Sequence, residues 1–149
     1  MKGINWHIKH FNKLTTRLFH DIIFLREEIF VIEQNCIYQD VDGKDLKSYH
    51  VFATDSNNKI VATCRVIEPD NNNTIYIGRV ACKKELRRYG IGNKMMQNAL
   101  VYIKEKHPDS RVQISAQTYL LNFYSSLGFI AYGDEYLEDN MPHKAMYLN

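Results

Sequence analysis

The residues best suited to chemistry form a basic turn with two glycines, from Arg87 to Gly92 (RRYGIG). β-favouring residues precede it between Ile75 and Cys82, and apolar residues at helical spacing follow it between Met95 and Ile103. The turn therefore leads from a strand into the first turn of a helix. Free N–H groups and the positive end of the helix dipole attract anions at such a place. Because Lys83 and Lys84 add positive charge, the pattern predicts a phosphate or pyrophosphate site.

Two familiar nucleotide loops do not fit this turn. A P-loop needs Lys and then Ser or Thr directly after its last glycine, whereas Asn93 follows Gly92 and Met95 follows Lys94. A dinucleotide fingerprint needs a third glycine at position 95 and a βαβ unit, whereas an antiparallel meander is predicted before this turn. The pattern Arg-x-x-Gly-x-Gly alone also fits an ordinary tight turn into a helix.

A second polar cluster lies in the acidic run from Asp40 to Asp45 (DVDGKD). It does not match a calcium loop, because glycine stands at the fourth position instead of the sixth and Val51 replaces the bidentate Glu at the twelfth. Two interpretations stay open: a loop rich in side-chain caps, or an acidic lining for a cationic substrate.

Three arginines occupy otherwise apolar segments, namely Arg26, Arg65 and Arg79. A charge in such a place must be paired or must belong to a site. We expect Arg26 to be paired with an acidic side chain. For Arg65 and Arg79, pairing and binding of an anionic part of a substrate are both open.

The elements that position these residues follow from hydrophobic periodicity and turn signals. They indicate the order β-α-β-β-β-α-β-α-β-β, an α+β domain with a mixed sheet that covers residues 1–149. Thr15 or Thr16 can cap the first helix, whose apolar face includes Leu18, Ile22, Leu25, Ile29 and Ile32. The predicted strands are 4–10, 49–54, 60–67, 74–82, 112–116, 129–132 and 143–148; helices cover 91–106 and 119–127, and residues 133–142 form an irregular polar loop.

Composition excludes several classes of protein. A net charge of +2 over 149 residues gives no basic surface for nucleic acid. The three cysteines are widely spaced and form no C-x-x-C pair, which favours reduced thiols in the cytoplasm. We expect no signal peptide, no membrane span and no metal site.

The order of motifs resembles the GNAT superfamily of acyl-CoA-dependent N-acyltransferases. A strand leads into Arg87-x-x-Gly90-x-Gly92 and an amphipathic helix, and a later segment reads F-Y-x-x-x-G-F from Phe123 to Phe129. Flanking stretches are similar to the ElaA-like branch of that superfamily. These stretches are LREEIFVIEQNC (25–36), YQDVDGKD (38–45), IGRV (77–80) and YLEDNMPH (136–143).

The resemblance implies a fold with a mostly antiparallel mixed sheet flanked by helices, and acetyl-CoA as co-substrate. The pyrophosphate is expected on the turn formed by Arg87, Arg88, Tyr89, Gly90, Ile91, Gly92 and Asn93, and the pantetheine arm beside Val80, Ala81 and Cys82. Tyr124 stands where many relatives protonate the departing thiolate. Gln117 replaces an asparagine that often contacts pantetheine, and Asn122 is a second candidate for that contact.

Acylation of an amine also requires a base and a polarised thioester. A backbone N–H near Val80 can polarise the carbonyl. Candidates for the base are Glu33, His143 and His50, in that order, with Asp42 as a further one. Arg79, His50 and Asp42 are candidate acceptor contacts.

Several functions remain open at this point. We expect an N-acetyltransferase that acts by direct transfer in a ternary complex, on a small-molecule or protein amine. Alternatives are a non-catalytic acyl-CoA-binding or sensing module, a regulatory domain without a CoA site, and ping-pong chemistry on Cys82. The sequence leaves a homodimer open.

Overall fold

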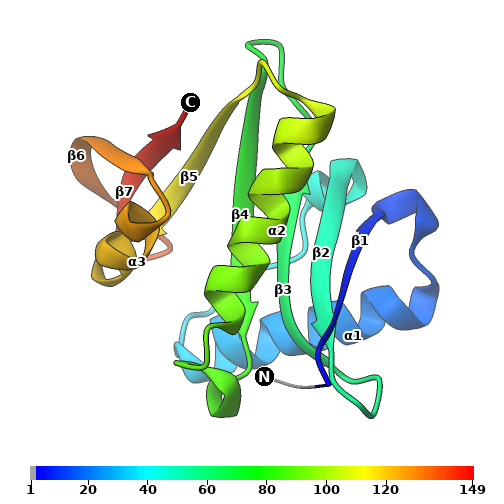
Figure 1. Ribbon diagram of the computed structural model, residues 1–149. Coiled ribbons are helices and arrows are strands. Elements are labelled where there is room, and N and C mark those ends of the chain that lie inside the picture. Colours follow the sequence, from blue (N-terminus) through cyan, green and yellow to red (C-terminus); the bar gives the residue numbers. More distant parts are fainter. Residues whose placement is uncertain (1–2) are drawn as a thin grey trace.

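A computed structural model describes residues 3–149 as a twisted seven-stranded sheet with helices on both faces (Figure 1). The spatial order of the strands is β1-β2-β3-β4-β5-β7-β6. All neighbouring strands are antiparallel except β4 and β5, which are parallel. The α+β class and the mostly antiparallel mixed sheet are as predicted. The strands are β1 Asn5–His10, β2 Ser48–Thr54, β3 Ile60–Ile67, β4 Thr74–Cys82, β5 Arg111–Gln117, β6 Ile130–Glu138 and β7 Met141–Leu148.

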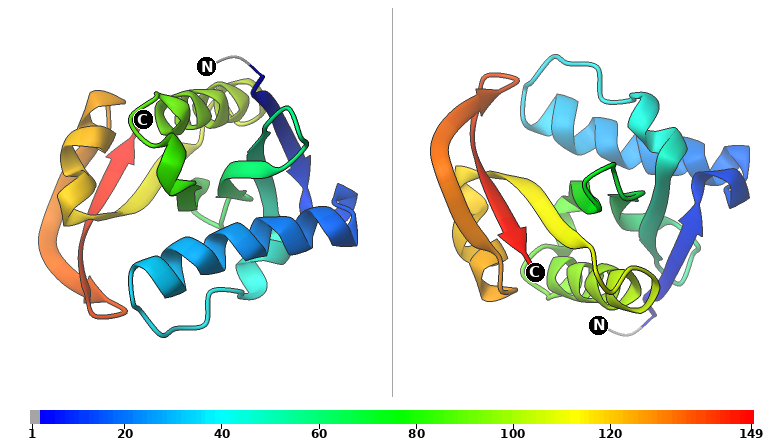
Figure 2. Two further views of the ribbon diagram at one scale, coloured as in Figure 1. Left: turned by 90° about the horizontal axis from the view of Figure 1, so that it is seen from below. Right: turned by 90° about the horizontal axis from the view of Figure 1, so that it is seen from above.

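The two long helices cover opposite faces of the sheet (Figure 2). α1 (Thr16–Arg26) packs its buried residues, with Ile22 and Leu25 among them, against Phe52 and Ala81 on one face. α2 (Ile91–Lys106) packs a stripe that includes Met95, Met96 and Ala99 on the other face. The shorter helical segments are η1 Phe11–Lys13, η2 Glu27–Glu33, η3 Gly43–Lys47, η4 Lys84–Leu86, η5 Thr118–Leu120 and α3 Leu121–Ser126.

The first helix begins as predicted, but its apolar face does not continue as expected. The Thr15 hydroxyl accepts a hydrogen bond from the Leu18 N–H at 3.1 Å and caps α1. From Glu27 to Glu33 the chain is a π-helix, which hydrogen-bonds over five residues instead of four. This change of register turns Ile32 to the surface, where it is 70% exposed, while Ile29 stays buried. The prediction that Ile32 belongs to the buried face was wrong.

The predicted polar loop at 133–142 is also wrong, because most of it is a hairpin. β6 continues to Glu138, with a break in register between Tyr132 and Tyr136, and β7 begins at Met141. Asp139 and Asn140 connect them, and both have positive φ, at 49° and 63°. Two such residues form the tight turn that suits the twist of a hairpin. β6 is exposed along its whole length. Its sequence therefore lacks the alternation of apolar and polar residues by which a half-buried strand is recognised.

The sheet contains one weak seam, where β4 meets β5. Only three residue pairs join these strands, from Thr74 with Arg111 to Tyr76 with Gln113. Beyond them both strands continue, to Cys82 and to Gln117, without pairing with each other. The seam therefore leaves one edge of β4 free over its second half.

Within residues 3–149, no helix combines the length and the apolar character that crossing a membrane requires.

Candidate functional site

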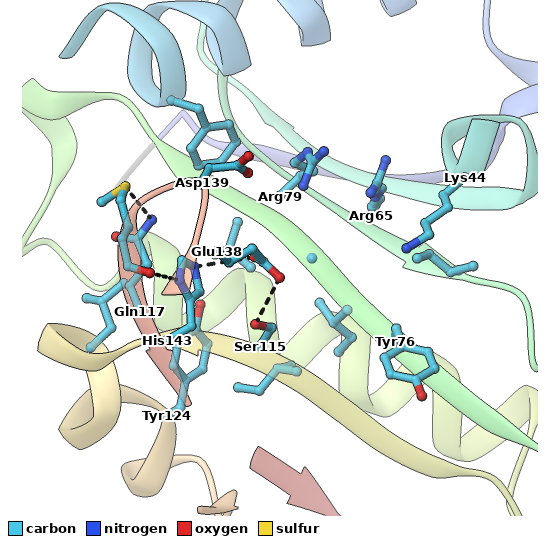
Figure 3. Close-up of a pocket in the computed structure, with 18 of the residues that line it drawn as sticks. Lys44, Arg65, Tyr76, Arg79, Ser115, Gln117, Tyr124, Glu138, Asp139 and His143 are labelled. Carbon is cyan, nitrogen blue, oxygen red and sulfur yellow. Dashed lines mark hydrogen bonds and ion pairs between the residues drawn. The ribbon is translucent and has the colours of Figure 1, made fainter. Parts of the chain in front are cut away.

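The seam between β4 and β5 opens into a cavity of about 760 Å³. One wall is formed by residues 77–80 of β4, and the other by Ile114, Ser115 and Gln117 of β5. Tyr124 from α3 and His143 from β7 lie at one end, as Figure 3 shows. Both halves of the sheet thus contribute to one site.

A β-bulge shapes the β4 wall of the cavity. Thr63 pairs with Ala81 and Arg65 pairs with Gly78, so Arg79 and Val80 together face the single residue Cys64. Arg79 has a φ of 52°, a left-handed conformation that costs a non-glycine residue about 1–2 kcal/mol. Such strain persists only where the surroundings hold it. Here the Arg79 guanidinium pairs with Asp40 at 2.8 Å and lies over the Tyr38 ring.

The bulge is held by a buried network of three arginines and three aspartates. Arg26, which is 1% exposed, contacts Asp40 at 2.8 Å and Asp45 at 2.7 Å. Arg65 contacts Asp42 at 2.7 Å and Asp45 at 3.0 Å. Burial alone would raise the pKa of Asp45, but hydrogen bonds and charge from Arg26 outweigh it, so the net shift is downward.

This network answers the question that the sequence left open for the arginines. All three are paired with aspartates, and Arg26 is paired as expected. Arg65 and Arg79 line the cavity, but their charges are balanced by carboxylates. The acidic loop from Asp40 to Asp45 therefore holds the arginine side chains in place beside the cavity.

Tyr124 is the most buried tyrosine at the cavity, with 6% of its surface exposed. Its ring packs edge-on against Phe123 and Phe129. Burial raises the pKa of the Tyr124 hydroxyl above its ordinary value. The group is therefore protonated at neutral pH, as a general acid must be before it donates.

The basic turn has the backbone that its glycines indicate. Gly90 has a φ of 80° and Arg88 one of 70°. The first bond of α2 runs from the Lys94 N–H to the Gly90 carbonyl at 3.0 Å. The N–H groups of Ile91, Gly92 and Asn93 therefore have no partner within the helix and remain available to an anion.

Gly90 and Gly92 should respond differently to alanine. Gly90→Ala forces a side chain into left-handed backbone and should lower the free energy of unfolding by about 1 kcal/mol. Gly92 lies inside the helix, where an added Cβ would contact Phe123 at an ordinary 3.7 Å. Gly92→Ala should leave stability unchanged or raise it by less than about 1 kcal/mol. Urea denaturation checks both, and equal losses would contradict this account of the turn.

Comparison with known proteins decides the family. Residues 26–149 match the acetyltransferase (GNAT) domain. The chain belongs to the GNAT family.

Full-length relatives support the ElaA-like branch of this family. The chain is 39% identical over 149 residues to a UPF0039 protein of Schizosaccharomyces pombe, and the alignment covers 99% of each. The crystal structure of Escherichia coli ElaA has 36% identity and a TM-score of 0.92, with 98% of this chain and 99% of that chain covered. An acyl-CoA N-acyltransferase from Pseudomonas aeruginosa has 35% identity and a TM-score of 0.91, with 97% and 98% covered.

Among the base candidates for a GNAT reaction, His143 is the one that the fold brings to the cavity. It is 6% exposed, and its Nδ1 donates a hydrogen bond to the Met141 carbonyl at 2.7 Å. Its Nε2 lies 3.4 Å from the Glu138 carboxylate. The ring stacks on Tyr136.

Glu33 lies outside this cavity and is held by the basic turn. Its carboxylate forms two hydrogen bonds with Arg87, at 2.6 and 2.9 Å. The hydrogen bond from Arg87 lowers the pKa of Glu33, although partial burial opposes the shift. Arg87 also donates from Nε to the Cys82 carbonyl at 3.0 Å. In this arrangement Glu33 connects the π-helix to the end of β4 and has no free access to the cavity.

His50 and Asp42 are likewise occupied elsewhere. His50 is 1% exposed, donates to the Asp45 carbonyl at 3.1 Å and packs beside Phe19. Asp42 caps η3 and pairs with Arg65. Neither belongs to the cavity lining that residues 3–149 form.

The predicted donor contacts are only partly gathered at the cavity. Val80 and Gln117 line it, and the Gln117 amide faces that of Gln34 at 3.4 Å. Asn122 is exposed on α3 and does not line the cavity. Burial raises the pKa of the Cys82 thiol, which disfavours the thiolate that ping-pong chemistry would need.

Sequence reasoning missed Glu138 as a cavity residue. It assigned residues 133–142 to an irregular loop, and a loop does not indicate where a side chain points. One signal was present, because Tyr136 and Glu138 are two residues apart and so share a face of a strand.

Proposed function

We propose that the protein is an N-acetyltransferase that moves the acetyl group of acetyl-CoA to a primary amine by direct transfer in a ternary complex. One observation carries the proposal: the free edge of β4 faces a cavity that contains the buried, protonated Tyr124. The pantetheine arm would pair with this edge beside Val80, Ala81 and Cys82, and the pyrophosphate would bind the turn from Arg87 to Asn93.

The residues of this chain then divide the chemistry. A backbone N–H at the Arg79–Val80 bulge, where the ladder to β3 is interrupted, would donate a hydrogen bond to the thioester oxygen as negative charge develops on it. The Tyr124 hydroxyl would protonate the departing sulfur. Ile77, Ile114 and Leu120 would form an apolar part of the wall beside the thioester.

A CoA-release assay tests the proposal. Acetyl-CoA is incubated with the full chain and a panel of small amines, amino sugars, amino acids and peptides, and free thiol is measured. We expect release that depends on one class of amine. Binding of acetyl-CoA by calorimetry without any release would instead favour a non-catalytic acyl-CoA-binding module, and no binding at all would contradict both.

The contact between Glu33 and Arg87 allows a test of whether Glu33 positions the turn or acts as the base. If Glu33 positions the turn, Glu33→Gln should raise the KM of acetyl-CoA about fivefold, because a partly exposed, two-bond ion pair of this kind is worth about 1 kcal/mol. The kcat should change less than about twofold. Steady-state kinetics with each substrate varied in turn measures both constants.

Glu28→Gln is the matched control for this change, since Glu28 is an exposed acid in the same π-helix. It should alter neither constant. A loss of kcat of about a hundredfold in Glu33→Gln, with an unchanged KM for acetyl-CoA, would instead identify Glu33 as the base.

A further inference from the structure

Two hydrogen-bond acceptors converge at one end of the cavity with no donor between them. The Met141 carbonyl can only accept, so Nδ1 of His143 carries the proton in this contact. In the neutral ring, Nε2 is then an acceptor. It faces Oε2 of Glu138 at 3.4 Å. Two lone pairs directed at each other are unfavourable unless a proton or a cationic donor lies between them.

Neighbouring strands hold both groups in place. The Ser115 hydroxyl lies 3.4 Å from Oε1 of Glu138 and also hydrogen-bonds the Tyr136 hydroxyl. His143 pairs across the sheet with Gln117 of β5 on one side and with Tyr136 of β6 on the other. Figure 3 shows the Glu138 carboxylate between the Ser115 hydroxyl and the His143 ring. The pair is therefore built into three strands.

Glu138 and Asp139 bring negative charge to this end of the cavity, which Lys44 and Lys47 also line. Figure 3 shows Lys44 on the side away from His143. The two arginines that line the cavity, Arg65 and Arg79, are each paired with aspartates. Glu138 has no arginine or lysine partner among residues 3–149. His143 balances the negative charge of Glu138 only when its ring is protonated.

We propose that Glu138 and His143 form the docking site for the acceptor, that the acceptor is a primary amine which enters as its ammonium ion, and that Nε2 of His143 takes the proton that must leave before attack. This inference rests on the proposed function. An ammonium group supplies N–H donors to both acceptors at once. A quaternary ammonium ion has the charge but no N–H and does not fit.

Groups at this site and solvent account for every proton and electron pair in the transfer of the acetyl group. The ammonium gives one proton to Nε2, and the imidazolium that forms is paired with Glu138. The nitrogen lone pair then forms the C–N bond, the C–S bond breaks, and its electron pair goes to sulfur. Sulfur takes a proton from Tyr124. The acylated nitrogen still carries two hydrogens and a positive charge, and it loses one proton, through solvent, to the Tyr124 phenolate to become the neutral amide. His143 releases the first proton to solvent, so one proton is lost in each cycle.

Binding of simple cations tests the docking site without turnover. The ring resonances of His143, assigned with His143→Gln, are followed by NMR while propylammonium chloride is added to the full chain. We expect a saturable shift with propylammonium and none with tetramethylammonium chloride. Equal responses to both salts, or no response to either, would overturn the inference.

Glu138→Gln keeps the shape of the side chain and removes its charge. It should weaken propylammonium binding about tenfold, since a hydrogen bond to a charged group is replaced by a neutral one. With the best amine from the panel, it should raise the KM of the amine by about tenfold or more and leave the KM of acetyl-CoA within about twofold. An unchanged KM for the amine would overturn the inference.

Glu135→Gln is the matched control, because Glu135 is an exposed glutamate on the same strand and does not line the cavity. It should behave as the unmodified chain does, and a matching loss in Glu135→Gln would overturn a specific role for Glu138.

The proposed acetyl transfer and the proposed cation site can fail independently of each other. If no amine releases CoA but propylammonium still shifts His143, transfer is contradicted and the cation site is supported.

Discussion

Replacing Tyr124 with phenylalanine should lower kcat by roughly 10²–10³-fold, with a change in the KM of acetyl-CoA below about threefold. The reason lies in the leaving group, because CoA departs from the thioester as a thiolate and a proton donor beside the sulfur makes that departure easier. The Tyr124 hydroxyl is kept protonated by burial and faces the cavity. Phenylalanine keeps the aromatic packing against Phe123 and Phe129, so the fold should persist.

Single-turnover measurements of thiol release separate this chemical step from release of products. Tyr119→Phe is the control, since Tyr119 is five residues away, is 70% exposed and does not line the cavity. It should retain full activity. Unchanged turnover in Tyr124→Phe would remove Tyr124 as the acid, whatever its effect on stability.

The second large effect concerns the buried network behind the bulge. Asp45→Asn should lower the free energy of unfolding by about 3–5 kcal/mol, because it leaves Arg26 and Arg65 with less than their full countercharge inside the protein. Asp45 is 1% exposed and contacts both guanidinium groups within 3.0 Å. Chemical denaturation at pH 7 measures the loss.

Measuring the free energy of unfolding as a function of pH gives a second check on this prediction. The pKa of Asp45 is lower in the folded chain than in the unfolded chain. The stability from its ionised form is therefore complete above about pH 4 and is lost as the pH falls through the folded pKa. The difference between Asp45→Asn and the unmodified chain should shrink over that range. Asp21→Asn, at a surface pair with Arg17, should cost only about 0.3–0.5 kcal/mol, and a comparable loss would contradict the network account.

The sequence predicted those parts of the fold that have regular periodicity. The stripe from Met95 to Ile103 identified α2 with its observed bounds, and alternation with turn signals identified β2, β3 and β4. The turn into α2 could be predicted because glycine favours the positive φ that Gly90 has. These features depend on local chemistry alone.

The rest could not be predicted because it depends on contacts between distant segments. Nothing near Glu33 in the sequence shows that Arg87 will hold it, 54 residues later. The π-helix rotates Ile32 outward without any glycine or proline to signal it. Glu138 reaches the cavity only because β6 pairs with β7 and brings its carboxylate beside His143.

The seam between β4 and β5 has a consequence for how the molecule moves. The sheet consists of two leaves, β1–β4 and β5–β7–β6, each antiparallel within itself, and three residue pairs form the hinge between them. A change in the angle between the two leaves would widen or narrow the cavity that lies between β4 and β5. A ligand that bonds to the free edge of β4 and touches β5 would favour the angle at which both contacts are made. Under the proposed function, bound acetyl-CoA would therefore also join the two leaves of the sheet.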